Sequence, residues 1–286
     1  MGKYLNPFTD FGFKKIFGEE VSKDLLIAFL NDLLEGEREV KDITFLNKER
    51  IGVSPDDRSA IYDVLCESPS GECFIVEMQN QRQRHFDDRS IYYVSKALGS
   101  QGEKGKAWDF HLNAVYGVFF MNFPFRANER NQRCGINKLR TNVVLMDEDL
   151  KVRFSDVMKM VYIQLPFFEK DEDACKSNFE RWIYVLKNME TLKRMPFKAK
   201  NAVFEKLEEI VDVASLNKED RVQYDRSLKA YRDYNNTIDF AREEGKEEGK
   251  IEERKNIARK LKSLGMDVPQ IEESTGLSAE EIEKIE

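Results

Sequence analysis

The sequence predicts an α/β fold followed by a helical extension at its C-terminal end. Three observations lead to this prediction. Strand-forming runs of β-branched and aromatic residues alternate with amphipathic helical patterns between residues 23 and 122. Two of these runs flank a short turn-forming segment, as in a β-hairpin. From residue 219 onward the chain is rich in Glu, Lys and Arg at helical spacing, which is typical of long solvated helices.

The composition indicates a globular protein and argues against a membrane-spanning chain or a familiar zinc site. The chain has 286 residues, of which 41% are hydrophobic, enough to bury a core in one large or two small domains. The apolar runs are too short to span a membrane and residues 1–7 lack a signal region, so we expect a cytoplasmic protein with no membrane partner. The four scattered cysteines and two histidines match no familiar zinc pattern, and we expect reduced, buried thiols. These residues are Cys66, Cys73, Cys134, Cys175, His85 and His111.

The first 49 residues predict one helix and one strand. Residues 1–20 are rich in phenylalanine, and we expect those rings to pack on the core. Ser22 is a suitable N-cap for a helix over residues 23–34, which carries an apolar stripe and ends before Gly36. Residues 43–49 predict the first strand.

A hairpin is expected next, with strands over residues 60–67 and 72–79. Pro69 suits the first central position of a type I turn, and Gly71 suits the left-handed position that follows it. Such a three-residue loop fixes which residues of the two strands face each other. A loop one residue longer or shorter would turn every side chain of one strand to the opposite face.

The predicted register places Asp63 opposite Glu77, with Gln79 on the same face. Two carboxylates within apolar strands are costly unless they are paired, hydrogen-bonded or bound to a metal. A hard divalent cation such as Mg²⁺ would relieve their repulsion, and with a polar group that orients water it would form a site for phosphodiester hydrolysis. The alternative is a structural network in which both carboxylates bind Arg side chains or backbone groups.

Five segments in this order resemble the recombination-promoting nuclease or transposase family of the PD-(D/E)xK nuclease superfamily. The resemblance extends over essentially the whole chain. It is carried by the residues from Asn6-Pro7-Phe8-Thr9-Asp10 to Gly18, the helix around Phe29–Leu34, Glu77-Met78-Gln79, Arg89-Ser90-Ile91-Tyr92-Tyr93 and the Glu-Glu-Gly-Lys tail.

The resemblance implies a restriction-endonuclease-like core, a mixed central sheet flanked by helices, and a metal-dependent DNA endonuclease linked to recombination or mobile elements. Asp63 and Glu77 would hold Mg²⁺, or Mn²⁺ in its place, with the Met78 carbonyl as a third ligand. Gln79 would orient the water, although the family usually has Lys there and Gln carries no positive charge. The alternative is a catalytically weak or inactive nuclease fold that acts as a DNA-binding or self-associating module.

The resemblance also suggests accessory residues. The first helix often supplies an acid in this superfamily, for which Asp10 and Glu20 are the candidates, and the helix after the motif often faces the site, with Arg89, Tyr93 and Gln101. An ordinary half-buried position is the alternative for Tyr93. The net charge of −7 counts against a generally electropositive DNA binder, so DNA contacts require a local basic rim. Its candidate residues are Lys14, Lys15, Arg58, Arg82 and Arg84.

The remaining pattern predicts further strands and a helical second half. A helix capped by Asp87 or Asp88 is expected over residues 88–101, followed by a continuous apolar strand over 114–122. Beyond these we expect a loop at 128–138, strands at 139–146 and 160–168, a helical region over 180–217, a charged helix over 219–255 and short helices after 256.

We therefore expect three parts: a nuclease-like domain over 1–217, a charged helical linker over 218–255 and a small helical module over 256–286. Apolar residues at helical spacing, including Leu264, and a capping box formed by Ser278 and Glu281 define the last module. The C-terminal helices are expected to mediate any homo-oligomer.

Overall fold

The computed structural model describes residues 2–46, 62–102, 109–124 and 138–285. The chain forms two compact units, Met1–Ser227 and Leu228–Glu286. The three-part division expected from the sequence stays a prediction, because it concerns which parts fold independently. Arg58 and most of the loop expected at 128–138 lie outside the described residues.

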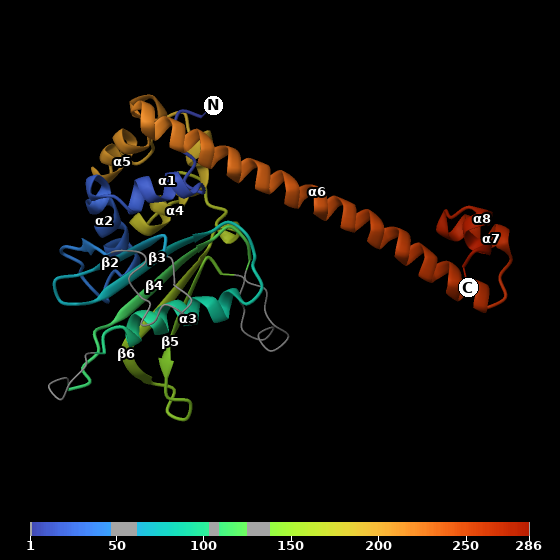
Figure 1. The fold of residues 1–286 in the computed structure, drawn as a ribbon, viewed down its shortest axis with the longest axis horizontal. Helices are drawn as coiled ribbons and strands as arrows, with labels where there is room; N and C mark the ends of the chain where they lie inside the picture. Colours follow the sequence, from blue (N-terminus) through green and yellow to red (C-terminus); the bar gives the residue numbers. More distant parts are fainter. Residues whose placement is uncertain (1, 47–61, 103–108, 125–137, 286) are drawn as a thin grey trace. The chain divides into compact units, whose positions relative to one another are not determined.

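A mixed sheet of six strands forms the centre of the first unit, with strand order β1-β2-β3-β4-β6-β5 (Figure 1). The inner strands β3, β4 and β6 run parallel, and β1, β2 and β5 pair in antiparallel fashion at the two edges. The α/β fold with a mixed central sheet is therefore confirmed. The strands are β1 (Thr44–Phe45), β2 (Val64–Glu67), β3 (Cys73–Gln79), β4 (Val115–Met121), β5 (Arg140–Met146) and β6 (Arg153–Gln164).

The hairpin of β2 and β3 has the predicted register. Val64 pairs with Val76, and the Ser68 N–H donates to the Glu72 carbonyl at 2.8 Å. Gly71 has a φ of +84°, the left-handed conformation that the turn requires. The strand predicted over 60–67 begins at Val64 in the structure, so Asp63 lies just before the regular ladder; residues 60 and 61 lie outside the described residues.

Helices cover both faces of the sheet (Figure 1). Helix α3 lies on one face, where Phe86 packs edge-to-face on Phe119 of β4. The next residue of that strand, Phe120, contacts Phe13 and Phe29 on the opposite face, because side chains alternate along a strand. The helices of the first unit are α1 (Asp10–Phe17), α2 (Lys23–Leu33), α3 (Phe86–Gly99), α4 (Asn178–Asn188) and α5 (Val203–Val211).

The structure differs from the predicted elements in several further places. Helix α1 lies within residues 1–20, where no helix was predicted, and the charged helix predicted over 219–255 extends over Lys218–Ser263. Helix α3 begins at Phe86 after His85 in a left-handed conformation, so the Asp87 or Asp88 cap is wrong; packing of Phe86 into the core sets the start. Strand β6 begins at Arg153 rather than at residue 160. The region over 180–217 is not one continuous helix, because α4 and α5 are separated by a segment that contains Pro196.

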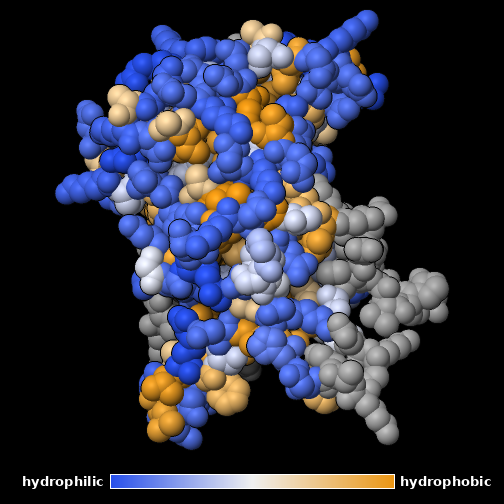
Figure 2. All heavy atoms as spheres, turned by 90° about the vertical axis from the view of Figure 1, so that its left-hand side faces the viewer, coloured by the Kyte–Doolittle hydropathy of each residue, from blue (hydrophilic) through white to orange (hydrophobic). Residues whose placement is uncertain are grey.

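The β5–β6 hairpin exposes large apolar side chains at its tip. Leu150 is 72% exposed and Phe154 is 77% exposed, and apolar side chains gather at the lower end of the view in Figure 2, where this hairpin lies. The ladder between β5 and β6 shifts register around Leu145. Such irregularity bends an edge strand and hinders pairing with another chain.

The second unit contains the C-terminal part of α6 (Lys218–Ser263) together with α7 (Val268–Thr275) and α8 (Ala279–Glu283). The predicted capping box of Ser278 and Glu281 is confirmed. Leu264 is 70% exposed, so this residue of the apolar pattern lies outside the core of the unit. The small core consists of Ala258, Ile271, Leu277, Ile282 and Ile285. Among the described helices, none combines the length and apolar character that crossing a membrane requires.

Candidate metal and catalytic site

Asp63 and Glu77 meet at the end of the β2–β3 hairpin. The Asp63 N–H donates to Glu77 Oε1 at 3.0 Å, and the Met78 N–H donates to Asp63 Oδ2 at 2.9 Å. Both bonds depend on the register of the hairpin, since they join the residues that the loop brings opposite each other. The two carboxyl groups are therefore held together by the backbone of both strands.

Glu77 is deeply buried, with 2% of its surface exposed. Burial, and after it the neighbouring Asp63 charge, raise the pKa of its carboxyl group to about 8. The hydrogen bond from Asp63 N–H and the charge of Arg89 act in the opposite direction. Without a cation, the buried site thus favours a proton on Glu77.

Gln79, Arg89 and Tyr93 lie around Glu77. Gln79 Nε2 donates a long hydrogen bond of 3.4 Å to Glu77 Oε2. The Arg89 guanidinium lies 5.2 Å from the centroid of the Tyr93 ring, an arrangement that permits a cation–π interaction. The charge of Glu77 contributes to the raised pKa of the half-buried Tyr93, after the larger contribution of burial. These three predicted residues are brought together with the carboxylates.

A small cavity of about 110 Å³ opens beside Asp63. It brings the Asp63 carboxylate and Met78 together with Asp10 from the N-terminus of α1. Asp10 is therefore near the site, although its exposed carboxylate also forms an ion pair with Lys14 at 2.5 Å. The full lining is Phe8, Thr9, Asp10, Phe13, Asp63, Met78 and Asn80.

The donor set suits a hard cation. Among the residues that the structure describes, no group of three or more His, Cys, Asp or Glu side chains is placed to hold a metal ion. A cation here would therefore have to combine two carboxylates with backbone, amide or water oxygens, which is the arrangement that Mg²⁺ accepts. Asn80 Oδ1 is buried in this region and has no hydrogen-bond partner among the described residues. Because side chains alternate along a strand, Asn80 lies with Phe13 and Met78 on the face of β3 opposite Glu77.

Two predicted accessory residues lie elsewhere. Both amide atoms of Gln101 bond to the backbone of Asn113, at 3.0 and 2.8 Å. Asn113 lies before β4, whose first residue pairs with Cys73, so Gln101 is at the opposite end of β3 from Gln79. Glu20 is exposed and does not line the cavity beside Asp63.

The expected basic rim is only partly available. Lys15 is paired with Glu19 at 3.0 Å and with Asp220 at 2.9 Å, which neutralise its charge. Lys14 is paired with Asp10. In contrast, Arg82 and Arg84 are exposed in the segment between β3 and α3.

The structure adds Asn80 to the residues identified from the sequence. The sequence shows Asn80 directly after Gln79, but nothing in the sequence pattern indicates that its carboxamide oxygen is buried. Asn80 Nδ2 donates to the Phe8 carbonyl at 2.5 Å, a contact between residues 72 positions apart. Only the folded chain reveals such a pairing.

The comparisons with known proteins agree with the geometry. No curated protein and no solved structure matches the chain. One family model matches residues 7–241, which include the whole sheet and every residue of the site, and it describes a PD-(D/E)XK nuclease family transposase. The chain belongs to this family of PD-(D/E)XK nuclease transposases.

Proposed function

We propose that the protein is a metal-dependent DNA endonuclease that acts in recombination or on mobile elements. The observation that carries the proposal is the buried Glu77 carboxyl group, which is hydrogen-bonded to the backbone of Asp63 at the end of β3. A buried carboxyl with a pKa raised to about 8 is costly to ionise, and a divalent cation would compensate for that cost. Family membership makes DNA the expected partner.

Asp63, Glu77 and the Met78 carbonyl would hold Mg²⁺, or Mn²⁺ in its place. When bound, the cation would lower the pKa of water and stabilise charge on the phosphate. Gln79 would orient the attacking water through its carboxamide, and Arg89 would supply the positive charge that Gln79 lacks. Tyr93 would hold the Arg89 guanidinium by its ring.

DNA would approach along the segment that follows Gln79, where Arg82 and Arg84 are exposed. Arginines in this position suit the phosphate backbone and would give affinity without reading the base sequence. We place the reaction in the cytoplasm, where the free thiols of Cys66, Cys73 and Cys175 would remain reduced.

Purified protein is expected to nick supercoiled DNA in Mg²⁺ or Mn²⁺, and to stop when EDTA is added. The physical reason is that the buried carboxylates cannot activate water without a cation. Nicking is measured on gels with supercoiled and linear substrates, with Ca²⁺ as a cation that binds similar ligands. Cutting that continues in EDTA would contradict the metal-dependent mechanism.

A second function, DNA binding without cleavage, is favoured by Gln79. Its carboxamide cannot stabilise a developing negative charge as a lysine does. A folded protein that binds DNA, yet leaves it intact with every cation, would establish this alternative.

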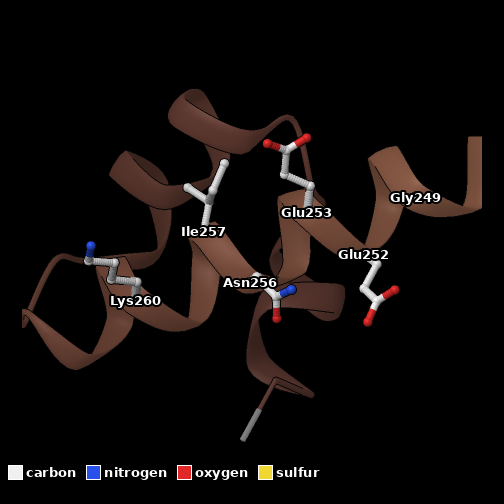
Figure 3. A pocket seen from close by; sticks show the side chains of 6 residues that line it. All are labelled: Gly249, Glu252, Glu253, Asn256, Ile257 and Lys260. Carbon is white, nitrogen blue, oxygen red and sulfur yellow. The ribbon is translucent and has the colours of Figure 1, made fainter. Parts of the chain in front are cut away.

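We further propose that a second copy of the chain binds along α6 of the second unit. A surface groove of about 380 Å³ follows this helix (Figure 3), where Ile257 is 45% exposed and Gly249 leaves room for close approach. Between residues 239 and 253 there are seven acidic and three basic residues, whereas all five charged residues from 254 to 262 are basic. Antiparallel pairing with a second α6 would bring these opposite charges together.

Light scattering is expected to give a dimer at micromolar concentration. Ile257→Lys should weaken the dimer by about tenfold or more, because it puts a charge into the groove. Leu264→Lys is the matched control, since it removes an apolar residue that is exposed but does not line the groove. Equal weakening by both variants, or a monomeric wild-type protein, would contradict this interface.

A further inference from the structure

Helix α3 exposes two large apolar side chains on the side that does not contact the sheet. Its inner side packs into the core, with Val94 fully buried (Figure 1). On the other side Ile91 is 46% exposed and Tyr92 is 43% exposed. A single exposed apolar residue is ordinary, but neighbouring ones beside a candidate active site indicate a contact surface.

Tyr93 connects this surface to the carboxylate pair. Its ring packs edge-on against the ring of Tyr62 at a centroid distance of 5.2 Å, and its carbonyl accepts a hydrogen bond from the Tyr62 hydroxyl at 3.2 Å. Tyr62 directly precedes Asp63, whose N–H donates to Glu77. The ring of Tyr92 in turn lies 6.3 Å from that of Tyr93. Two successive ring contacts therefore lead from Tyr92 to the residue beside Asp63.

The charges along this part of α3 are basic. From residue 89 to residue 99 the charged residues are Arg89 and Lys96, in a chain whose net charge is −7. They are seven positions apart, about two helical turns, and so lie on the same side of the helix. Arg89 lies 5.2 Å from the ring centroid of Tyr93, and Lys96 lies 5.6 Å from that of Tyr92. The acidic residues of α3 are confined to its first turn.

Exposed aromatic rings among basic side chains suit single-stranded nucleic acid. The cations attract the phosphates, and each unpaired base offers a flat face that stacks on an aromatic ring. In a duplex the neighbouring base pairs cover these faces, so a base must first leave the stack to reach a side chain. The ring of Tyr92 therefore favours an unpaired strand over a duplex.

We propose that the exposed surface of α3 formed by Arg89, Ile91, Tyr92 and Lys96 binds an unpaired strand of DNA next to the carboxylates. A base would stack on Tyr92, Ile91 would extend the apolar contact, and the two cations would contact phosphates. This inference rests on the proposed function, because it names the form of DNA that the site receives.

DNA binding in EDTA tests the proposal without cleavage. Fluorescence anisotropy compares a labelled oligothymidylate of about 12 nucleotides with a duplex of the same length. The wild-type protein is expected to bind the single strand at least about tenfold more tightly. Tyr92→Ala is expected to weaken single-strand binding by about tenfold or more, because it removes the stacking ring. Tyr92→Phe keeps the ring and should stay within about twofold of the wild type.

Tyr234→Ala is the matched control. Tyr234 is 51% exposed on α6 and does not belong to the α3 surface, so its loss should leave single-strand affinity unchanged. Both tyrosines are exposed, and their alanine variants are expected to melt like the wild type. Lys96→Gln should weaken binding and lower the slope of log affinity against log salt concentration by about 0.7, the value for one phosphate contact.

The outcomes separate this inference from the proposed function. Equal affinity of the wild type for single strand and duplex would overturn the role of the α3 surface. So would equal single-strand affinity in Tyr92→Ala and the wild type, even if the protein cuts DNA. A protein that binds the single strand through Tyr92, yet cuts no DNA with any cation, would keep this surface and overturn the metal-dependent function.

Discussion

Asp63→Asn is expected to lower metal-dependent DNA cleavage by about 10³-fold or more while the protein stays folded. The change removes a negative charge from the proposed cation site. A bound cation contributes several kcal/mol to stabilisation of the transition state, and each 1.4 kcal/mol corresponds to about tenfold in rate.

The fold is expected to tolerate this substitution because the backbone contacts of Asp63 survive. Asparagine still offers an oxygen to the Met78 N–H, and the bond from the residue 63 N–H to Glu77 Oε1 does not involve the side chain. Cleavage is measured under single-turnover conditions, and circular dichroism melting reports whether the protein remains folded.

Asp10→Asn provides a control on the same cavity. Asp10 lines it, but its exposed carboxylate is paired with Lys14, so we expect its loss to change cleavage by less than about tenfold. An Asp63→Asn protein that cuts DNA within tenfold of the wild-type rate would remove Asp63 from the mechanism.

The sequence alone was sufficient to predict the hairpin that builds this site. Pro69 and Gly71 specify the loop by their backbone preferences, and the loop fixes the register that brings Asp63 to Glu77. The continuous apolar run of β4 was likewise enough to predict a buried central strand. Both predictions depend on preferences of neighbouring residues along the chain, and contacts with distant residues do not change them.

The sequence was not sufficient where contacts with other parts of the chain determine the partners of a side chain or the start of a helix. Lys15 was expected on a DNA-binding rim, but Asp220, 205 residues away, forms an ion pair with it. Gln101 was expected to face the site, but the backbone of Asn113 takes both of its amide atoms. The start of α3 depends on where Phe86 packs rather than on the nearby aspartates.

A second large effect is expected from Glu77→Gln, which should stabilise the cation-free protein at alkaline pH. The pKa of Glu77 is raised in the folded state from an ordinary value of 4.5 to about 8, so folding favours its protonated form. The stability that this group contributes is fully present below about pH 4.5 and is lost as the pH rises through 8, at up to about 1.4 kcal/mol per pH unit.

Glutamine removes that dependence because it cannot ionise. In EDTA at pH 9 the variant should therefore unfold at a higher urea concentration than the wild type, and the difference should vanish near pH 4. Adding Mn²⁺ should reverse the order, because the cation stabilises only a protein that binds it. Urea unfolding at pH 4, 7 and 9, with EDTA and with Mn²⁺, measures all three effects.

Glu72, at the other end of the same hairpin, should respond with the opposite sign. Burial raises the pKa of its carboxyl group, but hydrogen bonds from Ser68 and Ser70 and the charge of Arg38 outweigh burial and lower the pKa overall. Glu72→Gln should therefore destabilise the protein at neutral and alkaline pH, and the difference from wild type should shrink as the pH falls. If both variants destabilise the protein at pH 9 in EDTA, then Glu77 is an ordinary structural carboxylate, and the unfavourable buried charge proposed to require a cation is absent.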